Sequence, residues 1–223
     1  MPLINRLITV KNESLNKQSL HFQSAICIIL LSIFVTQTHA GELTVDVLDA
    51  TGAPIENAVV YAEPEIKAPP SEATASIEQR GRQFNPLVSV VQTGTAITFP
   101  NFDSVRHHVY SFSPAKSFEL KLYSGVPSNP VKFDKAGTVV LGCNIHDFML
   151  AFVQVVDTPY FAKTNKLGKA TLHDLPNGNY TLKAWHYALA KEKDIYEKPV
   201  VVKGSQTATV NLTLKPFVIP SHK

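Results

Sequence analysis

Residues 138–156 read Thr-Val-Val-Leu-Gly-Cys-Asn-Ile-His-Asp-Phe-Met-Leu-Ala-Phe-Val-Gln-Val-Val. Valine-rich apolar runs lie at both ends of this stretch, and each is typical of a β-strand. Between them, Cys143, His146 and Met149 follow one another at intervals of three residues. The stretch therefore predicts two strands joined by a short loop that carries a thiolate, an imidazole and a thioether.

A second imidazole is available upstream, where His107 and His108 lie on a predicted neighbouring strand. One cysteine, two histidines and a weakly bound methionine are the ligands of a blue-copper centre. Taken singly, Met149 is a common core filler, His146 suits a turn, and the histidine pair could be ordinary strand residues. Their occurrence together, with Cys143, favours a site for one type 1 copper ion.

The first forty residues have the pattern of an export signal. A basic lead with Arg6, Lys11 and Lys17 precedes an apolar run over 25–35, and small residues lead up to Ala40. We expect cleavage after Ala40, a periplasmic mature protein and no stable membrane span, because the apolar run is short for one. The long basic lead leaves an uncleaved anchor or a downstream start as alternatives.

Removal of this segment would take away Cys27 and leave Cys143 as the only cysteine. No intramolecular disulfide is then possible. An odd cysteine in an exported protein indicates intermolecular pairing, a reactive thiol or a metal ligand. The nearby His146 and Met149 favour the metal ligand, whereas a buried, small apolar residue is the simpler alternative.

Charge and motifs exclude several classes of function. Three of the 21 basic and one of the 18 acidic residues lie in the first forty positions, so the remainder has a formal charge of about +1. The sequence has no basic stripe interleaved with aromatic residues, which argues against a nucleic-acid partner. It also lacks a phosphate-binding loop, a dinucleotide fingerprint and a nucleophile elbow.

After the signal, short apolar alternations are broken by glycine and proline, and no window carries a long helical period. Residues 117–123 alternate apolar and polar side chains as a half-buried strand does. This pattern predicts an all-β protein built from sandwiches. Strands are expected over 43–48, 58–62, 87–91, 96–99, 109–112, 117–123, 131–133, 138–141, 150–156, 169–172, 180–185, 199–202 and 207–214. Only 158–165 and 187–196 leave room for a short helix or a long loop.

The segment around the candidate ligands resembles a cupredoxin of the plastocyanin and amicyanin type. Residues 75–99 follow that family's first strands and its turn, and residues 101–109 stand where the family has an asparagine, a loop and the first histidine ligand. The Cys-x-x-His-x-x-Met spacing over 143–149 is similar to the compact ligand loop of amicyanin. The resemblance implies a Greek-key β-sandwich.

The same resemblance implies a role for each candidate ligand. Cys143, His146 and His107 would be the equatorial copper ligands, and Met149 the axial one. The family's ligand comes directly before a position that is usually asparagine, which selects His107 and leaves His108 in the asparagine's place. There His108 could hydrogen-bond to the ligand loop, or it could compete for the metal.

Residues around the candidate ligands lead to further predictions about hydrogen bonding and docking. Asn101 and Asn144 are candidate hydrogen-bond partners for loop backbone near the sulfur, or else ordinary loop residues. The family usually exposes the edge of its C-terminal histidine ligand within an apolar docking patch. Its members here would be Phe148, Ile145, Phe102 and Pro100, although Phe148 and Ile145 could equally be core.

A second resemblance concerns the two ends of the chain. Residues 41–63 contain an Asp-x-x-Gly-x-Pro turn, and residues 168–185 contain Leu-Pro-Asn-Gly-Asn-Tyr, as in the transthyretin-like or carboxypeptidase-regulatory-like sandwich. We therefore expect 41–68 and 158–215 to form one discontinuous, Ig-like sandwich. Residues 73–157 would form the inserted cupredoxin domain. The competing arrangement is one enlarged cupredoxin with a C-terminal addition.

These features predict a periplasmic protein that carries single electrons between redox partners, such as a c-type cytochrome or a dehydrogenase. An enzyme is not expected, because protein side chains would fill the copper's positions. The chain resembles plastocyanin-like proteins often labelled methylamine utilization proteins, but its residues support copper and not that pathway. Copper binding or delivery, and an adhesion module with a vestigial copper site, are the alternatives.

Overall fold

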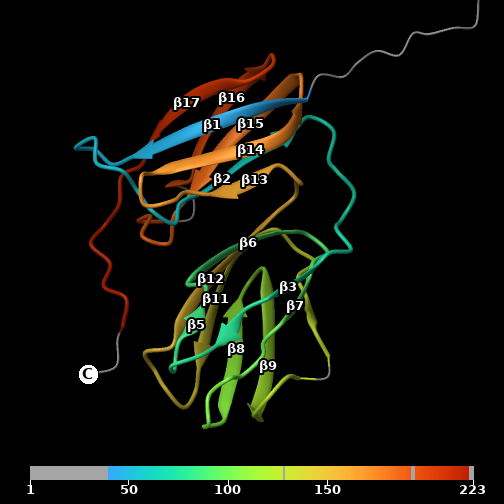
Figure 1. Cartoon of the computed structure of the whole chain (residues 1–223), viewed down its shortest axis with the longest axis vertical. Helices are drawn as coiled ribbons and strands as arrows, with labels where there is room; N and C mark the ends of the chain where they lie inside the picture. Colours follow the sequence, from blue (N-terminus) through green and yellow to red (C-terminus); the bar gives the residue numbers. More distant parts are fainter. Residues whose placement is uncertain (1–39, 128, 192–193, 221–223) are drawn as a thin grey trace, which may run out of the picture. The chain divides into compact units, whose positions relative to one another are not determined.

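The computed structural model describes residues 40–127, 129–191 and 194–220 (Figure 1). The described residues form strands arranged in five sheets and contain no α-helix, which confirms the predicted all-β class. Within these ranges no helix is long and apolar enough to cross a membrane. The predicted export signal lies almost wholly outside the described residues.

Strands from the two ends of the chain share two sheets. One sheet has the order β14 (Lys169–Pro176), β1 (Ala40–Leu48), β17 (Gln206–Asn211), with β1 antiparallel to β14 and parallel to β17. The other has the order β13 (Phe161–Lys163), β2 (Val59–Pro64), β15 (Gly178–Trp185), β16 (Tyr196–Val202). Segments more than a hundred residues apart in the sequence thus lie side by side.

These two sheets are held by a shared core. In β1, Leu43, Val45 and Val47 are fully buried, whereas Thr44 and Asp46 between them are partly exposed, as the two-residue period of a strand requires. Further members of the same cluster come from both sheets, including Val60, Ala62, Leu172, Leu182, Ala184 and Val210. Burial of these aliphatic side chains stabilises the pair of sheets.

The strands between β2 and β13 pair only with one another among the described residues. A five-stranded sheet has the order β6 (Val88–Gln92), β12 (Leu150–Val156), β11 (Gly137–Cys143), β8 (His107–Ser113), β9 (Lys116–Tyr123). The smaller sheets are β10 (Val131–Lys132), β7 (Ala96–Thr98), β3 (Thr74–Ser76) and the pair β4 (Glu78–Gln79), β5 (Phe84–Asn85). The division of these strands and those of the chain's ends into an inserted and a discontinuous domain stays a prediction.

The strands between β2 and β13 have a hydrophobic core of their own, which lies around the end of β11. Val139, Leu141 and Cys143 alternate inward and are buried, whereas Val140 is 40% exposed. They pack in one cluster with aromatic and aliphatic side chains that include Phe99, Phe133, Val109, Met149 and Val153. The cysteine is therefore directed into the core by the periodicity of its own strand.

Four short strands, β3, β4, β5 and β13, lie outside the strand ranges expected from the sequence alternation. Residues 158–165, expected to form a short helix or a long loop, contain β13, whose Phe161 lies opposite Tyr61 of β2. β3 was not among the ranges expected from alternation, although the resemblance to cupredoxins places first strands over 75–99, and it pairs in parallel with β7. Both β13 and β3 are three residues long, too short to display a recognisable alternation, so their neighbours in the sheet decide their conformation.

Candidate metal centre

The paired strands β8 and β11 bring His107 and Cys143 to the same end of their sheet. The register places Cys143 opposite Val109 of β8, two residues from His107. After Cys143 the chain turns, and the Met149 backbone N–H donates to the His146 carbonyl at 2.9 Å before β12 begins. Thus two strand ends and one tight loop carry all four predicted ligands.

Three of these side chains converge. The ligand atoms of His107, Cys143 and His146 all lie within 4.8 Å of one another. The His107 Nδ1 atom is 3.9 Å from the Cys143 sulfur, and the centroids of the His107 and His146 rings are 5.1 Å apart. Two of the three are buried, since His107 is 0% and Cys143 1% exposed, and His146 is partly exposed.

Met149, the fourth predicted ligand, is 1% exposed and belongs to the same buried cluster as Cys143. Its position is set by the turn that its N–H forms with His146. A methionine there can serve as packing or as a weak thioether ligand, because the two uses require the same burial.

The two adjacent histidines point to opposite faces of β8. His107 faces the core and the cysteine, whereas the His108 Nε2 atom lies 3.0 Å from a carboxylate oxygen of Glu119 on β9. The His108 ring also meets Tyr110 edge to face. His108 therefore lies outside the ligand cluster and is directed at Glu119 of β9, because successive strand residues alternate between faces.

Asp103 is a site residue that the sequence reasoning missed. One of its carboxylate oxygens lies 2.8 Å from His107 Nε2, the ring nitrogen remote from the cysteine. The backbone N–H groups of Gly81 and Arg82 donate to the same carboxylate at 2.6 and 2.9 Å. Its local signal was weak, namely an Asx turn in which the Asp103 N–H donates to the Asn101 side chain.

Hydrogen bonding keeps Asp103 ionised. Burial alone would raise the pKa of its carboxyl group, but hydrogen bonds from the Arg82 N–H, the His107 ring and the Gly81 N–H outweigh that effect and hold the pKa below its ordinary value of 3.8. A carboxylate only accepts hydrogen bonds, so His107 Nε2 carries a proton. In the neutral ring, Nδ1 then presents its lone pair toward the Cys143 sulfur.

The two asparagines differ. Asn101 is 4% exposed, and its amide nitrogen donates to the carbonyls of Val105 and Tyr123 at 2.9 and 3.1 Å. It thereby shapes the loop that leads into His107 rather than the loop around the sulfur. Asn144 is exposed.

Three of the four residues expected in the apolar patch are exposed or lie beside His146. Ile145 and Phe102 are 49% and 50% exposed, and the Phe148 ring lies 5.6 Å from the His146 ring. The guanidinium of Arg80 lies over the Phe102 ring at 4.5 Å. Pro100 is buried and contributes no exposed surface, so its inclusion in the patch was wrong.

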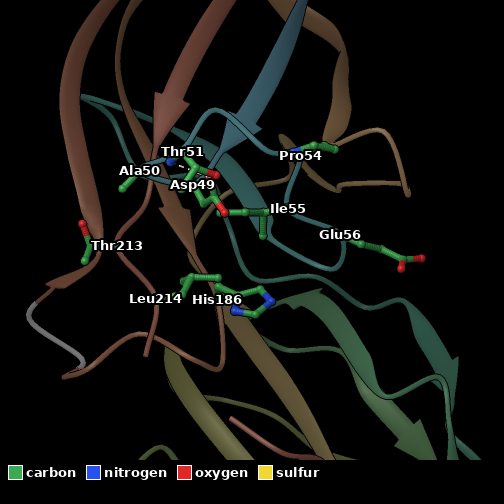
Figure 2. Close-up of a pocket in the computed structure, with 9 residues that line it drawn as sticks. All are labelled: Asp49, Ala50, Thr51, Pro54, Ile55, Glu56, His186, Thr213 and Leu214. Atoms are coloured by element: carbon green, nitrogen blue, oxygen red, sulfur yellow. Dashed lines mark hydrogen bonds between the residues drawn. The ribbon is translucent and has the colours of Figure 1, made fainter. Parts of the chain in front are cut away.

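A separate pocket lies in the sheets formed by the chain's ends. Figure 2 shows Asp49, Glu56 and His186 among its lining residues, and its volume is about 480 Å³. His186 is 5% exposed and accepts a hydrogen bond from the Ala188 N–H at 3.1 Å. Burial lowers the pKa of His186 to about 4, so the ring is neutral at pH 7. The contacts of His186 suit a packed side chain, as does the burial of Trp185.

No protein-family model matches the chain, and no curated protein matches it. Solved structures similar to it include a purple cupredoxin from Nitrosopumilus maritimus, at 22% identity and a TM-score of 0.33, covering 37% of this chain and 99% of that one. A reduced Cu(I) form of an amicyanin variant is 16% identical, with a TM-score of 0.35 and coverages of 44% and 98%. A copper-containing nitrite reductase from Thermus scotoductus is 20% identical, with a TM-score of 0.37 and coverages of 52% and 28%.

Proposed function

We propose that this protein binds one type 1 copper ion through His107, Cys143, His146 and Met149 and carries single electrons. The observation that supports this function is the convergence of one sulfur and two imidazoles within 4.8 Å at a mostly buried position. Soft thiolate sulfur together with imidazole nitrogen suits copper in both of its oxidation states.

The residues present fit such an ion. The Nδ1 lone pair of His107 faces the cysteine sulfur because Asp103 holds the other ring nitrogen. Met149 is a buried thioether in the same cluster, which suits a weak axial ligand. Copper bound there would supply reversible one-electron chemistry.

The protein's contribution to electron transfer is restraint of its ligands. Cys143 is fixed by pairing of β11 with β8 and β12, and His107 by pairing of β8 with β9. Side chains held in a close-packed core move little, so the ligand geometry should change little when the charge of the ion changes. A small change in geometry keeps the barrier to electron transfer low.

The route to a partner would pass through the partly exposed His146. Phe148 contacts its ring, and Ile145 is among the nearby exposed apolar residues. A small apolar surface of this kind suits a transient complex rather than a permanent one. We propose a redox protein such as a c-type cytochrome or a dehydrogenase as the partner and the periplasm as the location.

The test is to add Cu(II) to the purified chain and record its visible spectrum. We expect an intense thiolate-to-copper band at about 600 nm with one copper per chain. A reductant should bleach the band reversibly, and the protein should exchange electrons rapidly with a c-type cytochrome. The Cys143→Ser variant is the matched control and should give no band.

Two other outcomes would overturn the proposed role. Tight copper binding without fast electron exchange would indicate copper storage or delivery, and absence of binding would indicate a vestigial site. The burial of Cys143 and Met149 argues against delivery, because a receiving protein must reach the ligands that it replaces.

A further inference from the structure

We infer that Asp103 is a positioning residue for the metal site and that the turn between β4 and β5 holds it in place. Asp103 touches no proposed ligand atom of the site and would act through His107. The inference builds on the proposed function, in which His107 binds copper through Nδ1.

The turn forms a small anion-binding concavity. Arg80 and Gln83 close it through mutual backbone hydrogen bonds of 3.0 and 3.2 Å. At its tip, Gly81 and Arg82 have φ values of 63° and 57°, and their successive N–H groups both donate to the Asp103 carboxylate. Successive N–H groups directed at one anion form a nest. Arginine is unusual at a positive φ, so this conformation is specified by its surroundings.

The carboxylate joins this nest to His107. Its oxygens receive the two backbone N–H groups, and the oxygen bonded to Arg82 also lies 2.8 Å from His107 Nε2. The imidazole is fully buried, so water does not compete for this hydrogen bond while Asp103 is in place. The nest thus fixes the carboxylate, and the carboxylate fixes the orientation and tautomer of the ring.

Two separate effects on the bound metal follow. The hydrogen bond restrains rotation of the ring, which keeps Nδ1 directed at the site. The negative charge on the acceptor also makes the imidazole a stronger electron donor, which favours Cu(II) over Cu(I) and lowers the reduction potential. An amide at position 103 could still accept the hydrogen bond of the His107 ring through its single oxygen, but its NH2 group would face the Gly81 N–H, and the second effect would be lost.

A copper-free experiment tests the restraint directly. Nitrogen-15 NMR of the histidine rings in the apo protein should show His107 as a single tautomer with its proton on Nε2. In Asp103→Ala, the spectrum should show a mixture of tautomers or exchange broadening at His107, with the His108 signals unchanged. A single Nε2–H tautomer retained in Asp103→Ala would overturn the inference, whether or not the chain binds copper.

The copper-loaded protein tests the charge. Asp103→Asn should raise the reduction potential while the blue band remains, and Asp103→Ala should lower copper affinity by roughly 10–100-fold. Asp147→Asn is the matched control, since it removes an exposed carboxylate from the ligand loop next to His146. An equal rise in potential in Asp103→Asn and Asp147→Asn would mean that charge alone acts, and the inference would then be wrong.

Discussion

At the scale of single residues, the site depends on which face of β8 each histidine occupies. His107 and His108 are neighbours in the sequence, yet one lies against Cys143 and the other against Glu119. The alternation of strand side chains accounts for the separation. Alternation predicts that one of the pair faces inward and the cupredoxin resemblance favours His107, and the pairing of β8 with β11 places His107 against Cys143.

Substitution of the two histidines is the direct test of this difference. We expect His107→Ala to abolish the thiolate-to-copper band and His108→Ala to retain it, because only His107 reaches the sulfur. The measurement is the visible spectrum at saturating copper. A band that survives in His107→Ala and disappears in His108→Ala would show that His108, and not His107, is the copper ligand.

Met149 can be tested without opening a cavity. Met149→Leu retains most of the side-chain volume, so the free energy of unfolding should fall by less than about 1.5 kcal/mol. The thioether is lost, so the reduction potential and the spectrum of the copper protein should change. An unchanged potential and spectrum would show that Met149 is packing alone.

At the scale of elements, the loop over 144–149 and its two flanking strands could be predicted from the sequence. The predicted ends of the strands agree with β12 and fall within β11. The role of Asp103 could not be predicted in the same way, because the backbone groups that hold its carboxylate lie on a turn more than twenty residues upstream. A local sequence pattern does not predict a hydrogen bond between two separate loops.

Two glycines with positive φ, in two turns between the strands of the chain's ends, give a prediction at this scale. Gly168 has a φ of +71°, and an added Cβ would lie 2.6 Å from the Val47 carbonyl oxygen. Gly52 has a φ of +85°, but an added Cβ would meet nothing within 4 Å. We expect Gly52→Ala to lower the free energy of unfolding by about 1–2 kcal/mol through backbone strain alone, and Gly168→Ala to lower it by more.

Urea unfolding followed by the fluorescence of Trp185, the single tryptophan, would compare the two variants. Trp185 lies in β15 and is 3% exposed, so its emission should report loss of packing. Equal losses of stability in the two variants would contradict the proposed steric clash at Gly168.

At the scale of the whole molecule, His186 makes stability depend on pH. Its pKa is about 4 in the folded protein and near 6.5 when exposed, so the unfolded chain binds more protons between these values. This contribution to stability is present above pH 6.5 and is lost as the pH falls toward 4. Asp49 and Glu56 line the same pocket as His186.

We expect His186→Gln to flatten the pH dependence of the free energy of unfolding between pH 4 and 6.5. The removed slope should not exceed about 1.4 kcal/mol per pH unit, the limit for one proton. His173→Gln is the control, because His173 is exposed beside Glu42. If the two variants have the same pH profile, His186 does not account for the dependence.

The sequence alone determined the all-β class, most strand positions and the close grouping of Cys143, His146 and Met149. The two-residue alternation of strands and the six-residue separation of Cys143 from Met149 are properties of short stretches of sequence, so they can be recognised before the tertiary structure is known. The tertiary structure decided the convergence of His107 with Cys143, the hydrogen bonds from the Gly81 and Arg82 N–H groups to Asp103 and the pairing of β1 with β17. Each of these joins residues that are distant in the sequence or lie on separate loops. The alternation of a strand predicts which face a side chain occupies, but it does not predict which residue the side chain contacts on that face.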